Sequence, residues 1–147
     1  MNFETSVRIA RPIDEVFAFV SDPGNFPQWN SAVQAVRKTS EGERGVGSTY
    51  SMERELPSGR ARNEFEIVAC ERPNEFVIRT TSGPTPFVYR YRLSSENRAT
   101  VIRLDAQVEL EGAAALLGPL ARRAVKKGVD DNFAALKNVL EAQRSGR

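Results

Sequence analysis

The stretch RIARPIDEVFAFVSDPGNFPQWN, residues 8–30, decides how this chain begins to fold. Pro12 suits the first turn of a helix, and Asp14 and Glu15 follow where the positive end of the helix dipole favours acidic groups. An apolar stripe recurs at helical spacing, formed by Ile13, Val16, Phe17 and Val20. The helix is predicted to end near Ser21, because Pro23 and Gly24 come directly after it.

Seven strands and one more helix are predicted outside this helical segment. Residues 3–10 alternate apolar and polar positions and are predicted to form a strand. Turn sequences such as ERPNE and SSENR separate the other predicted strands, which are residues 31–38, 47–56, 60–71, 75–81, 86–94 and 99–110. Residues 113–142 carry apolar residues at three- and four-residue steps and are predicted to form one long helix. Gly118 and Pro119 either kink its first turns or mark where its regular part begins.

This order of elements predicts an α+β fold. A seven-stranded antiparallel sheet must cover its apolar face, and the terminal helix is the large element available to do so. We therefore expect the sheet to curl around that helix. The sequence shows no internal repeat, so we expect one domain over residues 1–147, with a frayed tail at 143–147.

The opening stretch also carries a pattern that resembles a known superfamily. Pro12, Val16, Asp22, Pro23 and Trp29 are spaced as in START-like proteins, also called SRPBCC, which include polyketide cyclases/dehydrases and lipid-transport proteins. The resemblance continues through the strands and the closing helix. It implies the helix-grip fold, with two short helices after the first strand and a cavity between sheet and terminal helix. Members bind lipids, hormones or polyketides, or catalyse reactions, on one scaffold.

Phe26 and Trp29 lie in a segment that cannot form a long helix or a central strand. Pro23 and Pro27 stiffen this segment, so ordering the two rings costs less conformational entropy. In the resembled fold the segment packs against the closing helix and shuts one side of the cavity. Two interpretations stay open for the rings: an anchor that joins the helices to the sheet, and direct contact with a ligand.

The composition argues against several classes of partner. The 147 residues include 21 basic and 19 acidic side chains, a net charge of +2, which gives no support for nucleic acid or an anionic membrane as partner. Cys70 is the single cysteine, which excludes an intrachain disulfide and fits a reducing compartment. No stretch resembles a signal peptide or a membrane span. We therefore expect a cytoplasmic protein without stable membrane insertion.

The sequence contains no histidine, and this removes much of the usual catalytic chemistry. A Ser-His-Asp or Cys-His mechanism is excluded. A zinc site would need Cys70 together with carboxylates, an improbable donor set. The glycines at 42, 45 and 47 lack the lysine and the following helix of a phosphate-binding loop. We expect no metal and no cofactor.

Polarity predicts which side chains face the terminal helix. In the last two strands the inward apolar sets are Phe87, Tyr89, Tyr91 and Leu93, and Ile102, Leu104, Ala106, Val108 and Leu110. If residues 57–60 form a four-residue turn, Leu56 pairs with Ala61, Arg54 with Asn63, Met52 with Phe65 and Tyr50 with Ile67. Across the next turn, Phe65 is predicted to lie opposite Thr80, and Ile67 opposite Ile78.

These registers predict an apolar cavity with one polar end. Arg54, Asn63 and Thr80 lie near the hairpin tips, and a filled core has no use for an inward arginine and asparagine. Alternatively, Arg54 and Asn63 reach water at the tips. The small residues that begin the terminal helix leave room for a ligand. The predicted ligand-binding residues are Trp29, Tyr50, Met52, Arg54, Asn63, Phe65, Ile78, Thr80, Phe87, Tyr89, Leu104, Ala106, Leu117 and Ala121.

Three functions remain open from the sequence. The first is a binding protein for a small hydrophobic molecule, such as a lipid, a polyketide or an aromatic compound. The second is an enzyme of the polyketide cyclase or dehydratase kind, with Tyr50, Tyr89, Arg54 and Asn63 as candidates for polarising carbonyls. The third is an interaction protein with an exposed apolar patch. The pairs Arg122-Arg123 and Lys126-Lys127 are interpreted as a solvated helix face or a partner site, and a homodimer stays open.

Overall fold

A computed structural model describes residues 1–56 and 59–143. The chain forms a helix-grip α+β fold, as predicted. Its elements in chain order are β1 (Asn2–Ile9), α1 (Ile13–Val20), the 3-10 helix η1 (Pro23–Gln28), β2 (Val33–Lys38), β3 (Thr49–Leu56), β4 (Gly59–Glu71), β5 (Glu75–Ser82), β6 (Phe87–Glu96), β7 (Ala99–Val108), α2 (Ala113–Leu116) and α3 (Pro119–Ala142).

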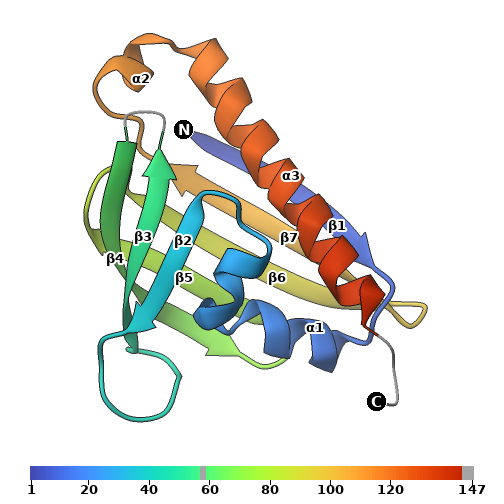
Figure 1. The fold of residues 1–147 in the computed structure, drawn as a ribbon. Coiled ribbons are helices and arrows are strands. Elements are labelled where there is room, and N and C mark those ends of the chain that lie inside the picture. The colour runs from blue at the N-terminus through green and yellow to red at the C-terminus, as the bar shows by residue number, and fades with distance from the viewer. Residues whose placement is uncertain (57–58, 144–147) are drawn as a thin grey trace.

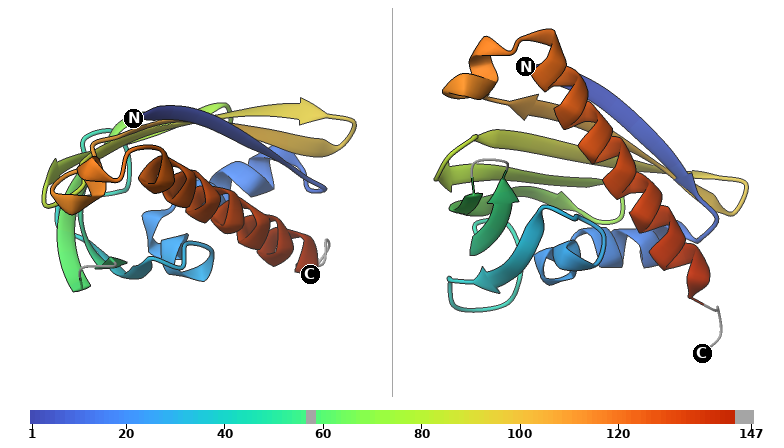
Figure 2. Two further views of the ribbon diagram at one scale, coloured as in Figure 1. Left: turned by 90° about the horizontal axis from the view of Figure 1, so that it is seen from above. Right: turned by 45° about the horizontal axis from the view of Figure 1, so that its top comes forward.

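The strands form one antiparallel sheet in the order β1-β7-β6-β5-β4-β3-β2. The sheet curls as a single layer, and α3 runs across its concave face (Figures 1 and 2). Helices α1 and η1 lie on the same side of the sheet as α3. The core therefore lies between the concave face and the helices, where Phe17, Phe65 and Leu136 are fully buried. None of the described helices is long and apolar enough to cross a membrane.

The opening stretch folds as its residues predict. Pro12 precedes α1 in an extended conformation, and Val16, Phe17 and Val20 bury the apolar stripe. Asp22 then caps η1, because its carboxylate accepts a hydrogen bond of 3.0 Å from the backbone N–H of Gly24. The cap fixes the turn between α1 and η1, and this turn carries Phe26 and Trp29 towards the core.

The predicted pairing of β3 with β4 is wrong by two residues. Leu56 lies opposite Gly59 instead of Ala61, Arg54 opposite Ala61, Met52 opposite Asn63 and Tyr50 opposite Phe65. Gly59 and Arg60 belong to β4 itself, so the expected four-residue turn is too long; residues 57 and 58 lie outside the described residues. A shift of two leaves every side chain on its predicted face, because the side-chain period of a strand is two. The predicted pairs of β4 with β5, Phe65–Thr80 and Ile67–Ile78, are confirmed.

The expected helix over residues 113–142 is divided at Gly118. This residue has φ of 52°, outside the helical region, and Pro119 occupies the first position of α3. Of the two alternatives that the sequence left open, Gly118 and Pro119 mark the start of the regular helix. Residues 144–147 of the expected frayed tail lie outside the described residues.

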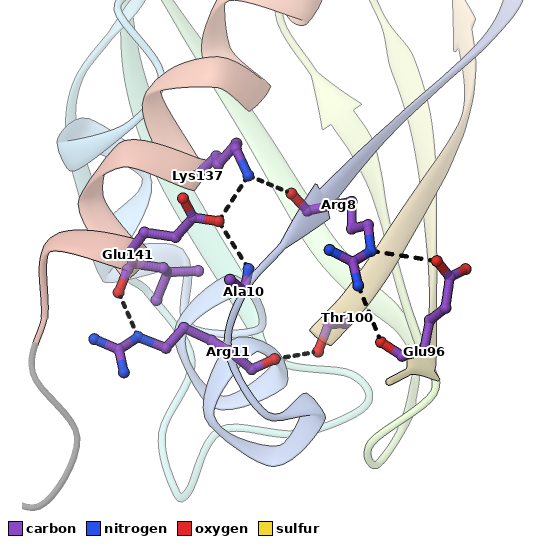
Figure 3. A network of polar contacts seen from close by, with 8 residues as sticks. Arg8, Ala10, Arg11, Glu96, Thr100, Lys137 and Glu141 are labelled. Carbon is purple, nitrogen blue, oxygen red and sulfur yellow. Dashed lines mark hydrogen bonds and ion pairs between the residues drawn. The ribbon is translucent and has the colours of Figure 1, made fainter. Parts of the chain in front are cut away.

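Polar contacts fix the C-terminal end of α3 to the junction between β1 and α1 (Figure 3). The ammonium of Lys137 donates to the backbone carbonyl of Arg8 at 2.8 Å and pairs with Glu141 at 2.7 Å. The carboxylate of Glu141 also accepts the backbone N–H of Ala10 at 2.7 Å. Arg11 donates to the carbonyl of Leu140 at 2.9 Å, which satisfies one of the free carbonyls at this helix end.

Replacing Glu141 with glutamine should give a pH-dependent loss of stability. The hydrogen bonds from Lys137 and Ala10 lower the pKa of Glu141, so its ionised form stabilises the fold above the pKa of an unfolded glutamate. At pH 7 we expect Glu141→Gln to lower the free energy of unfolding by about 1 kcal/mol or less, since the group is partly exposed. The gap should close as pH falls below the usual pKa of a glutamate and through the lowered pKa of the folded state.

Urea denaturation at pH 7 and at about pH 3 measures this gap. Glu53→Gln on the exposed side of β3 is the matched control and should differ little from the parent protein. A gap that is as large in acid as at neutral pH would contradict a role for the ionised carboxylate.

Candidate functional site

A cavity of about 280 Å³ lies between the concave face of the sheet and α3. The sheet contributes side chains from β2, β3, β5 and β6, and η1 and the loop after it close one side. Six of the predicted ligand-binding residues line it: Trp29, Met52, Arg54, Ile78, Phe87 and Tyr89. The structure thus brings residues that are far apart in the sequence together around one hollow.

The other eight predicted residues do not line this cavity. Tyr50, Asn63, Phe65, Leu104, Ala106 and Ala121 are buried in the packed interior. Tyr50 stacks on Phe65 with ring centroids 5.2 Å apart, which fills the space that the sequence assigned to a ligand. Thr80 exchanges hydrogen bonds with the backbone of Phe87, and Leu117 is exposed.

The wall formed by α3 lies later in the helix than expected. The lining residues are Ala124, Val125, Gly128, Val129 and Asn132, which all follow the predicted Leu117 and Ala121 in the chain. Their sequence signal is a pair of small residues four positions apart, Ala124 and Gly128, beside the apolar Val125 and Val129. Val33 and Tyr91 also line the cavity and were not predicted to do so. Phe26 lines it too, and ligand contact was one of the two interpretations that the sequence left open for its ring.

Trp29 is held among aromatic rings on the helix side of the cavity. Its ring meets Phe26 edge-on at 5.7 Å, Tyr91 edge-on at 6.5 Å, and Phe133 of α3 at 6.4 Å between centroids. Trp29 therefore joins η1, β6 and α3, as the anchor interpretation expected. Among the described residues, its indole N–H is the one buried side-chain polar atom without a hydrogen-bond partner. Buried donors normally have an acceptor, so this N–H is a candidate to bind one from a ligand.

The polar end of the cavity is an ordered network. Arg54 donates through Nη1 to the side-chain oxygen of Asn63 at 2.9 Å, and its guanidinium lies 5.7 Å from the ring centroid of Phe87. The amide nitrogen of Asn63 donates to the backbone carbonyls of Ser82 and Pro84, at 3.2 and 2.7 Å. Asn63 is fully buried, so it does not reach water. It orients Arg54 along the cavity wall instead.

Arg54, Tyr89 and Tyr91 are the hydrogen-bond donors among the titratable groups of this wall, and burial shifts the pKa of each. It raises the pKa of Tyr89, a shift that the nearby Arg54 partly offsets, and it raises the pKa of Tyr91 well above the usual value. Burial lowers the pKa of Arg54, yet an arginine stays charged at neutral pH. At pH 7 the wall therefore presents one cation and two neutral phenols.

The cavity opens between the end of β3 and the first half of α3. Three of its lining residues are exposed: Glu55 on β3, and Ala124 and Gly128 on α3. Glu55 is the one carboxylate among the described lining residues, and it lies 3.7 Å from Arg60. Within the described chain, no three Cys, Asp or Glu side chains gather in an arrangement that could hold a metal ion.

Comparison with known proteins supports one family. The family model described as "Polyketide cyclase / dehydrase and lipid transport" matches residues 1–141. A search of curated proteins found no significant match. Among solved structures, TTHA0849 from Thermus thermophilus is similar with a TM-score of 0.83 at 15% identity, covering 98% of this chain and 100% of that one.

Two further structures have the same fold. A START superfamily protein from Mycobacterium smegmatis gives a TM-score of 0.79 at 16% identity, covering 96% of this chain and 97% of its own. The Zhui aromatase/cyclase from Streptomyces sp. R1128 gives 0.77 at 13% identity, covering 99% and 98%. At these identities the solved structures support the fold, and the family model covers nearly the whole chain. The chain therefore belongs to the polyketide cyclase/dehydrase and lipid transport family.

Proposed function

We propose that this protein binds a small, largely apolar molecule in the cavity between the sheet and α3. The observation that carries the proposal is the cavity itself, whose walls are mostly aromatic and aliphatic, with Arg54 as its inward cation. Its volume of about 280 Å³ is close to the lower bound of about 300 Å³ for small-molecule sites, so a compact ligand fits best.

The polar groups of the wall favour a ligand that carries a hydrogen-bond acceptor. Arg54 and the neutral phenol of Tyr89 are donors at pH 7, and Trp29 has a buried N–H without a partner. A carbonyl, phenolate or carboxylate oxygen on the ligand matches this set. An aromatic or polyketide-like compound with a ketone or acid group combines both requirements.

Native mass spectrometry of the protein purified from its own host tests the proposal directly. We expect a copurified small molecule, or saturable one-to-one binding of the neutral dye N-phenyl-1-naphthylamine, displaced by aromatic ketones. Absence of both, at protein concentrations where the fold is intact by circular dichroism, would count against a ligand cavity.

Arg54→Met should separate the contribution of the apolar cavity walls to ligand binding from that of the charged hydrogen-bond donors of Arg54. Methionine keeps the apolar stem of the side chain but removes the donors, so affinity for the neutral dye should change little. Affinity for an aromatic carboxylate should fall by about tenfold or more, because the charge-assisted hydrogen bond is lost. Isothermal titration with a matched pair, 2-naphthoate and 2-methylnaphthalene, measures both. An equal loss for the two compounds would assign Arg54 to packing.

A second candidate is a cyclase or dehydratase acting on the same kind of ligand. Support comes from the family and from the donors, because Arg54 and Tyr89 are suited to stabilising an enolate oxygen. Tyr50 and Asn63, also candidates from the sequence, lie outside the cavity wall. If turnover of a polyketone is found, Arg54→Met and Tyr89→Phe should lower kcat at saturating substrate. If the protein only binds, they change affinity alone.

A further inference from the structure

Three leucines at the start of the terminal helical region are exposed to an unusual degree. Leu116 of α2 is 89% exposed, Leu117 is 57% exposed, and Leu120 in the first turn of α3 is 68% exposed. We call these three residues the leucine patch. They lie at the projecting end of the molecule that α2 and the start of α3 form at the top of Figure 1. Exposed large apolar side chains that gather within five residues of the chain are typical of an interaction surface.

Basic side chains follow the leucine patch directly along α3. Arg122, Arg123, Lys126 and Lys127 are all exposed. Leu120, Arg123 and Lys127 are spaced three and four residues apart and so share one face of the helix. The lysines pair with Asp130 and Asp131 one turn later, at 2.8 and 2.7 Å. The two arginines, nearest to the leucines, form no ion pair among the described residues.

We propose that the leucine patch and these basic residues dock the protein on the surface of an anionic lipid bilayer. The leucines enter the boundary between head groups and acyl chains, and the arginines and lysines contact acidic head groups. The net charge of +2 does not indicate binding to an anionic membrane, because these basic residues are concentrated on one part of α3 and acidic residues elsewhere in the chain offset their charge. Docking of this kind is peripheral and needs no membrane-spanning segment.

The chemistry of the surface fits a bilayer better than an acidic protein. Energetically dominant contacts in protein interfaces are rich in tryptophan and tyrosine, and leucine is under-represented there. The leucine patch contains no aromatic residue, and its aliphatic side chains come from the last residue of α2, the turn after it and the first turn of α3. Aliphatic tips beside arginine and lysine are the composition of interfacial amphipathic segments.

The position of this surface relates it to the cavity. Ala124 and Gly128, which are exposed at the cavity opening, lie about one and two turns beyond Leu120 on α3. A protein docked through the leucine patch therefore holds the opening close to the lipid surface, where poorly water-soluble molecules accumulate. The docking itself does not depend on the proposed ligand and is tested without it.

Vesicle co-sedimentation with the full chain tests the proposal. We expect binding to vesicles of phosphatidylcholine mixed with phosphatidylserine and much weaker binding to phosphatidylcholine alone. Raising the salt from about 0.1 M to about 0.5 M should release the protein. Joint replacement Leu116→Ser, Leu117→Ser and Leu120→Ser should lower the vesicle partition coefficient by about tenfold or more. Arg122→Gln with Arg123→Gln should lower it by about tenfold.

Matched controls lie away from this surface. Val46→Ser removes a 66%-exposed apolar side chain from the loop between β2 and β3, which lies far from α2 in Figure 1. Arg37→Gln with Arg98→Gln removes two exposed basic groups. Both controls should bind vesicles like the parent protein. Thermal melting by circular dichroism should show that every variant is folded, and dye binding in the cavity should be unchanged in the leucine variant.

Several outcomes would overturn the proposal. The first is equal binding to neutral and anionic vesicles, or none to either. The second is a folded leucine variant that sediments with vesicles like the parent. Binding to soluble polyglutamate but not to vesicles would assign the surface to an acidic protein. A dimer in analytical ultracentrifugation that the leucine replacements turn into a monomer would assign it to a second copy of the chain. Absence of dye binding in the parent protein would contradict the proposed function alone.

Discussion

Gly128→Phe should abolish or strongly weaken ligand binding while leaving the protein folded. Gly128 lies in the α3 wall at the cavity opening, and no atom lies within 4 Å of where a Cβ would stand. A Cβ therefore fits without displacing a neighbouring element, and we expect the phenyl ring that it carries to occupy space at the cavity entrance. Phenylalanine also has the higher helix propensity, so stability should stay equal or rise slightly. We expect dye affinity to fall by at least about tenfold, which corresponds to about 1.4 kcal/mol.

Ala134→Phe is the matched control for this experiment. It places the same ring on the same helix, but Ala134 is exposed and is not among the lining residues of the cavity. Dye titration should give parent-like affinity for Ala134→Phe and a large loss for Gly128→Phe. Parent-like affinity in Gly128→Phe would mean that the ligand does not occupy this cavity.

Gly83→Ala should produce the largest loss of stability of any glycine-to-alanine change in the described chain. Gly83 has φ of 100°, and an added Cβ would stand 2.4 Å from the backbone oxygen of Arg62 and 2.7 Å from the amide nitrogen of Asn63. The methyl group cannot be accommodated without moving β4 or breaking the hydrogen bonds of Asn63. We expect the free energy of unfolding to fall by about 3 kcal/mol or more in urea denaturation.

Gly42→Ala is the control that separates the cost of positive φ from the cost of a steric clash at the added Cβ. Gly42 also has positive φ, at 87°, but nothing lies within 4 Å of its hypothetical Cβ. Its cost should be limited to the penalty of about 1–2 kcal/mol for a residue with a Cβ at positive φ. Similar losses for the two variants would show that close approach to Asn63 has no role. Gly83→Ala should also weaken carboxylate binding where the protein is folded, because Asn63 orients Arg54.

The fold was predictable from the sequence because local and global signals agree. The structure contains two short helices, α1 and η1, after the first strand. Pro12, the apolar stripe of α1 and the cap at Asp22 all favour them. Alternation along β6 and β7 assigned Tyr91 and Leu104 to the interior, and both are buried there. Such patterns repeat over many residues, so an error at one position does not change the outcome.

The lining of the candidate site was less predictable. Polarity gives the face of each strand but not how tightly side chains fill the space, so Tyr50 and Phe65 could not be distinguished from true cavity walls. The predicted register between β3 and β4 was wrong because turns that differ in length by two residues leave the same side chains on the buried face. The pattern of polar and apolar residues therefore does not distinguish between the two turns. The placement of α3 along the sheet depends on distant contacts such as Asp130 with Thr5, which no local pattern encodes.

The tie between α3 and the β1–α1 junction is confined to one end of the helix. Within the described chain, no side-chain hydrogen bond joins residues 119–129 to another element, whereas Lys137 and Glu141 are held firmly. Asp130 and Asn132 add hydrogen bonds to Thr5 and to the backbone N–H of Ser31, so the part of α3 that lacks such bonds is its N-terminal half. We therefore expect local opening of α3 to be confined to this N-terminal half, which includes Ala124 and Gly128 at the cavity opening, so that small molecules can enter and leave while the interior beneath Phe133 and Leu136 stays assembled.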